Sequence, residues 1–249
     1  MPGPPTPWRT RGRGLVCTGT EGAQRLGTLG LDLAAAAFAL ARRFAAGATL
    51  WCWSPEWPHH AQHIAVEFVH PVIVGKRALP AEAVEGADVT AVLRSLAVPG
   101  DVLAAVAPAS DGHVASLLRR ASAWGVTTMW VGAGRRPATG AADHVLWLDA
   151  PEAAWSGDLV LAYHVLWELT HVCFEHPGLL REQACTDAVC TTCSDEARVA
   201  EVVALGDDGM ATVRTAGGPE AVDATLVGPV TAGDLVLVHA GTAIGRVEQ

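Results

Sequence analysis

Hydrophobic and polar residues follow two different patterns along this chain, and the pattern changes near residue 190. Between residues 20 and 176, apolar positions fall either at helical spacing or in short continuous runs. The runs predict buried strands at 48–53, 101–107, 126–131 and 144–148, and the helical spacing predicts helices at 20–46, 59–69, 112–124 and 155–175. Strands that alternate with helices in this way are typical of a parallel sheet covered on both faces.

From residue 199 onward, apolar positions alternate with period two, which is typical of half-buried strands. Short strands are predicted at 202–205, 211–215, 224–230 and 235–241, separated by glycine-containing turns at 206–209, 217–219 and 232–234. This pattern predicts a small closed or nearly closed β unit. The whole chain is therefore expected to be α/β, with a disordered tail (1–19), an α/β domain (20–176), a linker (177–192) and an all-β barrel (193–249).

Composition narrows the classes of partner. The chain is 50% hydrophobic and carries 26 acidic against 17 basic residues, so a negatively charged nucleic acid is not an expected partner. Arg42 and Arg43 interrupt the longest alanine-rich stretch, and no apolar segment follows the arginines near the start. We therefore expect no membrane span and no signal peptide, and a cytoplasmic protein. Cys185, Cys190 and Cys193 lie close together, which favours ligands or free thiols over a disulfide framework.

The β unit contains Gly233–Ile244, which reads GDLVLVHAGTAI, and Cys193 precedes its first strand. In both respects it resembles the hydrogenase maturation chaperones of the HypC/HupF family. The resemblance implies a small OB-like barrel. It also implies that Cys193 holds an iron centre with cyanide and carbonyl ligands and passes it to the precursor of a nickel-iron hydrogenase large subunit, together with other maturation proteins. His239 matches the histidine of the terminal motif.

Cys193 departs from the family pattern because it is internal and continues as Ser-Asp-Glu-Ala, so no free α-amino group can stand beside the thiol. A thiolate suits the centre, being a soft ligand for iron. Cys190 or Cys185 could supply a second ligand, or both could be linker thiols without a role. His239 could ligate the iron or only stabilise the barrel.

The N-terminal part resembles the sugar isomerase (SIS) fold, and within it the phosphoheptose isomerases. The resemblance rests on His59–Val69 and the following Ala78-Leu-Pro-Ala81. It implies that His63, Glu67 and His164 serve a metal such as zinc, with Glu67 and His164 catalytic if the chain is an isomerase. His63 and Glu67 are four residues apart and share one helix face, as two ligands require. The alternative is that the two histidines are inherited core residues.

Two loops argue against an isomerase. Residues 53–57 are bulky where the family has small residues, and residues 107–112 keep only Ser110 of the phosphate-binding hydroxyls and add Asp111. Ser156 stands where the family completes its metal site with glutamine. The first hypothesis is therefore a hydrogenase maturation chaperone. The alternatives are a metal-dependent phosphosugar isomerase and a sugar-phosphate-binding protein. The apolar segment 31–40 predicts a homo-oligomer formed through the N-terminal domain.

Overall fold

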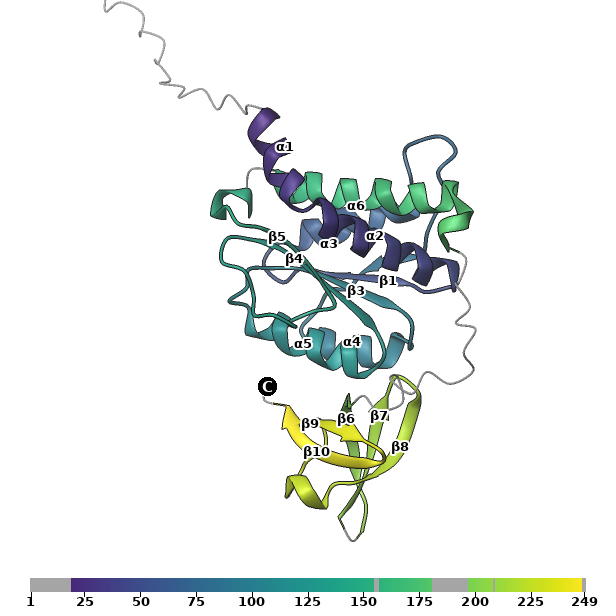
Figure 1. Ribbon diagram of the computed structural model, residues 1–249, viewed down its shortest axis with the longest axis vertical. Helices are drawn as coiled ribbons and strands as arrows, with labels where there is room; N and C mark the ends of the chain where they lie inside the picture. Colours follow the sequence, from purple (N-terminus) through teal and green to yellow (C-terminus); the bar gives the residue numbers. More distant parts are fainter. Residues whose placement is uncertain (1–18, 155–156, 181–196, 208, 248–249) are drawn as a thin grey trace, which may run out of the picture.

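The computed structural model describes residues 19–154, 157–180, 197–207 and 209–247, which form an α/β unit and a β unit (Figure 1). The predicted tail and linker lie largely outside these ranges. Within them, no helix has both the length and the apolar character needed to cross a bilayer.

The N-terminal unit is built on a five-stranded sheet in which every pair of neighbours is parallel, in the order β2-β1-β3-β4-β5. Its elements in chain order are α1 (Gly19–Thr28), α2 (Gly30–Ala45), β1 (Leu50–Trp53), α3 (Pro58–Val69), β2 (Ala81–Ala83), α4 (Val89–Leu96), β3 (Val102–Val106), α5 (Gly112–Ala123), β4 (Thr127–Ala133), β5 (His144–Leu148), a 3-10 turn (Pro151–Ala154), α6 (Asp158–Glu175) and a second 3-10 turn (Pro177–Leu180). The predicted α/β fold with a parallel sheet is confirmed.

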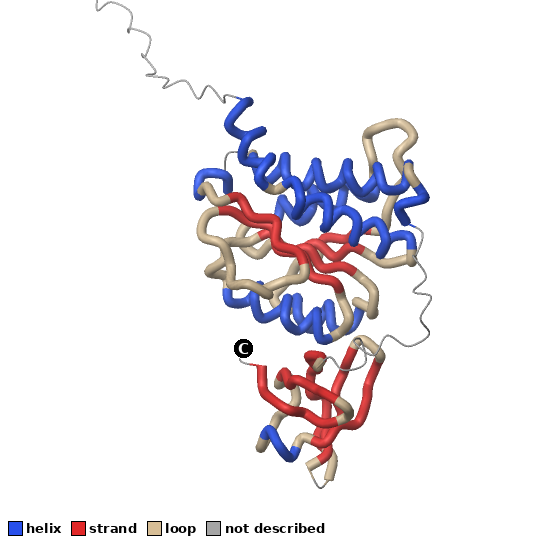
Figure 2. Tube along the Cα trace, in the orientation of Figure 1, coloured by secondary structure: helices blue, strands red, loops and turns tan. Residues whose placement is uncertain are grey.

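Helices cover both faces of this sheet, as Figure 2 shows. The central strand β3 is buried throughout, and its side chains alternate between two cores. Val102, Ala104 and Val106 pack with α2, α3 and α6, whereas Leu103 and Ala105 pack with α4 and α5. A strand buried on both faces loses the polar alternation of a surface strand, which explains why its sequence is a continuous apolar run.

Two details of the N-terminal unit differ from the prediction. The helix expected at 20–46 is two helices, interrupted at Leu29 between Gly27 and Gly30, since glycine is a poor helix former. Strand β2 and helix α4 were not predicted. β2 has only three residues, Ala-Glu-Ala at the sheet edge, and none of them is buried. A strand this short and polar carries no period-two signal.

The C-terminal unit consists of β6 (Arg198–Leu205), β7 (Met210–Thr215), β8 (Gly218–Asp223), a 3-10 turn (Thr225–Val227), β9 (Leu235–His239) and β10 (Thr242–Val247). Hydrogen bonding connects them in the closed order β10-β8-β7-β6-β9. The strand expected at 224–230 is wrong, because the 3-10 turn lies there and Gly228 has a positive φ of 70°. Strands β8 and β10 were not predicted.

The barrel packs against α4 and α5 of the N-terminal unit through apolar residues, among them Leu235, and through one buried carboxylate. Glu201 on β6 is 1% exposed, and its Oε1 accepts hydrogen bonds from Arg94 of α4 and Arg120 of α5. Its Oε2 accepts one from Nε1 of Trp124 at 2.7 Å. Arg120 also donates to the Gly233 carbonyl at 2.6 Å. We call Glu201, Arg94, Arg120 and Trp124 the interdomain cluster. Every oxygen of its carboxylate is satisfied, so the two units are fixed to each other.

Candidate functional site

Helix α3 supplies two of the predicted site residues. It begins at Pro58, whose fixed φ suits the first turn of a helix, and it buries one face that includes Ile64 and Phe68 against the sheet. Burial of that face leaves His63 and Glu67, four residues apart, on the side that faces α6. The third residue, His164, comes from the facing side of α6.

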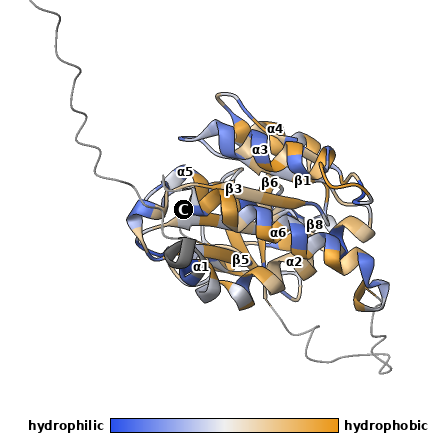
Figure 3. Ribbon diagram, turned by 90° about the horizontal axis from the view of Figure 1, so that it is seen from above, coloured by the Kyte–Doolittle hydropathy of each residue, from blue (hydrophilic) through white to orange (hydrophobic). Residues whose placement is uncertain are grey.

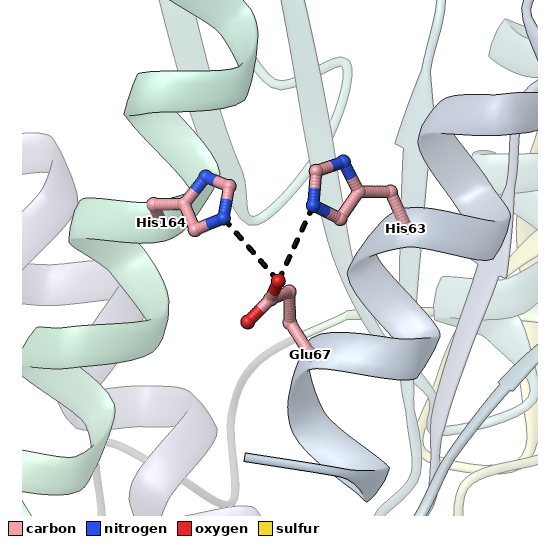
Figure 4. A group of neighbouring side chains, drawn as sticks. All are labelled: His63, Glu67 and His164. Carbon is pink, nitrogen blue, oxygen red and sulfur yellow. Dashed lines mark hydrogen bonds and ion pairs between the residues drawn. The ribbon is translucent and has the colours of Figure 1, made fainter. Parts of the chain in front are cut away.

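The structure brings these three side chains together (Figure 4). Nε2 of His63 lies 3.3 Å from Oε1 of Glu67, and Nε2 of His164 lies 3.5 Å from the same oxygen. One potential ligand atom from each residue lies within 4.8 Å of the other two. The histidine side chains are 39% and 36% exposed and Glu67 is 16% exposed, so the group is open to solvent on one side. We call these residues the ligand cluster.

Neighbouring groups determine how the ligand cluster is oriented. Nδ1 of His164 lies 2.7 Å from the Val160 carbonyl, one turn earlier in α6. A carbonyl only accepts, so Nδ1 must carry the proton and Nε2 of a neutral ring is left with a lone pair toward Glu67. Trp167 ties the two helices together, because its Nε1 donates to the backbone carbonyl of Glu67 at 2.8 Å.

Tyr163 and His60 lie directly behind His63, and the sequence analysis did not identify either of them. The Tyr163 hydroxyl lies 3.1 Å from Nδ1 of His63 and 3.3 Å from Nδ1 of His60. Burial, with His59 and His63 nearby, lowers the pKa of His60 to about 4, so His60 is neutral near pH 7. Burial and then Glu67 raise the pKa of Tyr163 to about 12, so its hydroxyl keeps its proton. The only sequence signal for them is their position: His60 stands three residues before His63 on the same helix, and Tyr163 directly precedes His164.

The ligand cluster fits a divalent cation such as zinc. Two imidazoles and one carboxylate are a common zinc ligand set that leaves a fourth position open. Ligands at about 2.0–2.1 Å from a tetrahedral ion lie about 3.3 Å apart, and the two nitrogen-to-oxygen distances here are 3.3 and 3.5 Å. When bound, the ion would be held by His63, Glu67 and His164 and would act as a Lewis acid. Ser156, which replaces the glutamine expected there, lies outside the described residues.

Two of the groups beside the predicted phosphate-binding loops make contacts within the chain, whereas Ser110 lines a cavity of about 330 Å³ with Arg135 and Arg136. Oδ1 of Asp111 accepts hydrogen bonds from the backbone N–H groups of His113 and Val114, at 2.9 and 3.0 Å. These N–H groups form the start of α5, where an anion would otherwise bind. Ser54, in the bulky loop after β1, is buried and donates to the Val106 carbonyl at 2.7 Å. Asp111 also lines a cavity of about 420 Å³ with Glu85 and His113.

The cysteines of the sequence-based hypothesis, Cys185, Cys190 and Cys193, lie outside the described residues. His239 is described and lies at the end of β9, partly buried. Since Val238 pairs with Arg198, His239 belongs to the end of the barrel where β6 begins. The hairpin that follows turns at Ala240 and Gly241, both with positive φ.

Comparisons with known proteins found similarities to both units. Residues 197–249 match the model of the HupF/HypC family. The N-terminal part is similar to a phosphoheptose isomerase from Francisella tularensis, at 16% identity and a TM-score of 0.54, over 63% of this chain and 93% of that one. A phosphoheptose isomerase from Neisseria gonorrhoeae is less similar, at 15% identity and a TM-score of 0.49, over 64% and 96% of the two chains. A search of curated protein sequences found no match.

These findings confirm the resemblance drawn from the sequence, namely a HupF/HypC-type unit that follows a sugar isomerase fold. At 16% identity, the likeness to an isomerase establishes the fold of the N-terminal unit and not its substrate.

Proposed function

We propose that this protein is an accessory chaperone in the maturation of nickel-iron hydrogenase, and that Cys193 carries the iron centre with its cyanide and carbonyl ligands. The observation that carries the proposal is the match of residues 197–249 to the HupF/HypC family. The proposed partners are the large-subunit precursor and other maturation proteins.

The chemistry of a thiolate supports Cys193 as the carrier. A thiolate binds iron strongly, and it can be exchanged for a thiolate of the receiving protein without dismantling a closed set of ligands. His239 lies at the barrel end where β6 begins at Arg198, and Cys193 precedes Arg198 by five residues in the sequence. His239 is therefore the described side chain that we assign to the environment of the carried centre. Cys190 is a candidate second ligand.

Substitution of the carrier cysteine tests the proposal. The protein is purified without oxygen from a host that makes the iron centre, and infrared spectra are recorded where cyanide and carbonyl absorb and protein does not. We expect Cys193→Ser to lose these bands and to fail to support hydrogenase maturation, because serine offers no thiolate. Cys52→Ser is the matched control, since Cys52 is a buried thiol of the α/β core. A Cys193→Ser variant that matures hydrogenase fully would contradict the proposal.

A second candidate function is a metal-dependent phosphosugar isomerase, favoured by the convergence of His63, Glu67 and His164. The contacts of Asp111 and Ser54 oppose it, because the Asp111 carboxylate caps the start of α5 and the Ser54 hydroxyl donates to the Val106 carbonyl. The test is turnover of sedoheptulose 7-phosphate with added zinc, for which we expect no appreciable rate. A rate that disappears in Glu67→Gln would make the isomerase the first hypothesis.

We also propose that the N-terminal unit forms a homo-oligomer. Leu31 and Phe38 on α2 and Leu161 on α6 are exposed, at 88%, 37% and 44%. The two helices pack against each other, and Figure 3 shows hydrophobic stretches along both. Exposed apolar side chains on adjacent helices are typical of a surface that another chain covers. Light scattering at micromolar concentration tests this, and a monomer would contradict it.

A further inference from the structure

A buried tryptophan fixes the end of each of the neighbouring strands β3 and β4. Nε1 of Trp130 donates to the carbonyl of Ala107, which follows β3, at 3.1 Å. Nε1 of Trp147 donates to the carbonyl of Gly134, which follows β4, at 2.8 Å. Both indoles are 1% exposed and pack edge to face, with ring centroids 6.0 Å apart. The loops that leave these two strands therefore start from fixed positions.

A cavity of about 330 Å³ lies between these two loops. Ser110 lines it from the loop after β3, and Arg135 and Arg136 line it from the loop after β4. The other lining residues are alanine and proline, so no acidic side chain of a described residue lines this cavity. Its volume is within the range of small-molecule sites, which begins at about 300 Å³. The two guanidinium groups make it a basic cavity in a chain whose formal net charge is -9.

The cavity between β1 and β3 has the opposite charge. The chain places β2 on one side of β1 and β3 on the other, and ligands of open α/β sheets usually bind at such a change of direction. The cavity at this place, of about 420 Å³, is lined by two carboxylates, those of Glu85 and Asp111, and by His113. Carboxylates repel an anion, whereas guanidinium groups attract it. An anionic ligand is therefore expected between β3 and β4 and not at the usual place.

The polar side chains of the basic cavity have little to bind within the chain. Among the described residues, none forms a hydrogen bond or ion pair with the side chains of Arg135 and Ser110. Nη2 of Arg136 lies 3.2 Å from Oδ2 of Asp32 and 3.5 Å from the Val145 carbonyl. The side chains of Arg136 and Asp32 are 50% and 45% exposed, and an ion pair so exposed is weak. Arg136 can therefore exchange Asp32 for an oxygen of a ligand.

We propose that Arg135, Arg136 and Ser110 form a binding site for a small molecule that carries a phosphate or a carboxylate group. A guanidinium group presents a planar set of N–H donors that matches the oxygens of either group, and the serine hydroxyl donates one further hydrogen bond. The site shares no residue with the ligand cluster, which comes from α3 and α6. It also uses neither Ser54 nor Asp111.

Calorimetric titration of the whole protein at constant ionic strength tests the proposal, with inorganic phosphate in one arm and malonate, a dicarboxylate, in the other. We expect saturable binding of at least one of them, and the tighter one identifies the group that the ligand carries. Arg135→Gln/Arg136→Gln should weaken binding about a hundredfold, since each charged hydrogen-bond donor contributes about tenfold or more. Arg135→Gln alone should weaken it about tenfold and leave thermal unfolding unchanged, because the Arg135 side chain has no described partner.

Arg42→Gln/Arg43→Gln is the matched control. It removes the same two charges from another cavity, of about 670 Å³, which Asp143 also lines. This variant should bind the anion within about twofold of the parent, since salt screens distant charges. The proposal is overturned if neither anion binds the parent or if Arg135→Gln/Arg136→Gln binds as tightly as the parent. It is also overturned if the two double variants weaken binding equally, because net charge alone would then account for the attraction.

Discussion

The ligand cluster and the interdomain cluster both place a glutamate between two basic side chains, yet they have opposite characters. Glu201 is 1% exposed, and arginine and indole N–H groups saturate its carboxylate. Glu67 is 16% exposed and faces the Nε2 atoms of two imidazoles. In His164, the Val160 carbonyl holds the proton on Nδ1, so Nε2 of the neutral ring carries a lone pair. Arginine cannot give up its proton, whereas imidazole can present a lone pair. The first arrangement therefore holds the two units together, and the second is a candidate cation site.

Removal of the two imidazoles of the ligand cluster should have the largest effect, which is on the zinc content of the protein. We expect His63→Ala/His164→Ala to lose zinc altogether, because one carboxylate alone does not hold the ion. The measurement is metal content after purification, with Cys193→Ser in both the parent and the variant. His59→Ala/His70→Ala is the control, since both side chains are exposed and outside the ligand cluster. Equal zinc in parent and double variant would mean that the cluster is only a polar contact between two helices.

The interdomain cluster should be sensitive to loss of its carboxylate rather than to metal. We expect Glu201→Ala to lower the free energy of unfolding by about 3–5 kcal/mol, because Arg120, 13% exposed, and the buried Trp124 indole lose the carboxylate that they share. Urea denaturation should then show separate transitions for the two units. Glu220→Gln is the matched control. It removes an ion pair with Arg198 whose side chains are 32% and 49% exposed, and should cost less than about 1 kcal/mol. An equal loss of unfolding free energy in Glu201→Ala and Glu220→Gln would show that Glu201 does not hold the two units together.

Acid should lower the stability of the protein through His60, which lies with Tyr163 behind the ligand cluster. The pKa of His60 is lowered from 6.5 to about 4, so the unfolded chain takes up its proton first as the pH falls. The free energy of unfolding should therefore decrease between pH 6.5 and about 4, by at most about 3 kcal/mol from this group. His59, His63 and Tyr163 surround it. Denaturation series for the parent and His60→Leu measure the difference, and identical slopes would exclude His60 as its source.

The smallest expected effect concerns the start of α5. Asp111→Ala removes an N-cap that accepts from His113 and Val114, and should destabilise the protein by about 1 kcal/mol. It also frees two N–H groups for an anion. We expect inorganic phosphate to raise the melting temperature of this variant more than that of the parent. A parent that phosphate stabilises equally would show that Asp111 does not exclude anions.

The parts of the fold that could be predicted are those in which burial sets the sequence. β3 and β5 are apolar because helices cover the sheet. The spacing of four residues between His63 and Glu67 predicts that they share one face of a helix. β8 could not be predicted because it begins Gly-Pro and contains acidic residues. In the sequence, nothing distinguishes Glu201 from a polar residue on the solvent-facing side of a barrel strand. Its burial depends on Arg94 and Arg120, which lie 107 and 81 residues away and which no local pattern connects to it.

The long separation between Glu201 and its donors also sets the order in which these residues are synthesised. Arg94, Arg120 and Trp124 all precede Glu201, so during synthesis they leave the ribosome well before their acceptor. The α/β unit can fold first, as N-terminal domains generally do, but its α4 and α5 surface then waits with three donors exposed to water. The barrel completes that surface only after its own first strand has emerged. We therefore expect the barrel to be the last part of the molecule to settle, and a ribosome-bound chain ending before residue 197 to show an accessible Trp124.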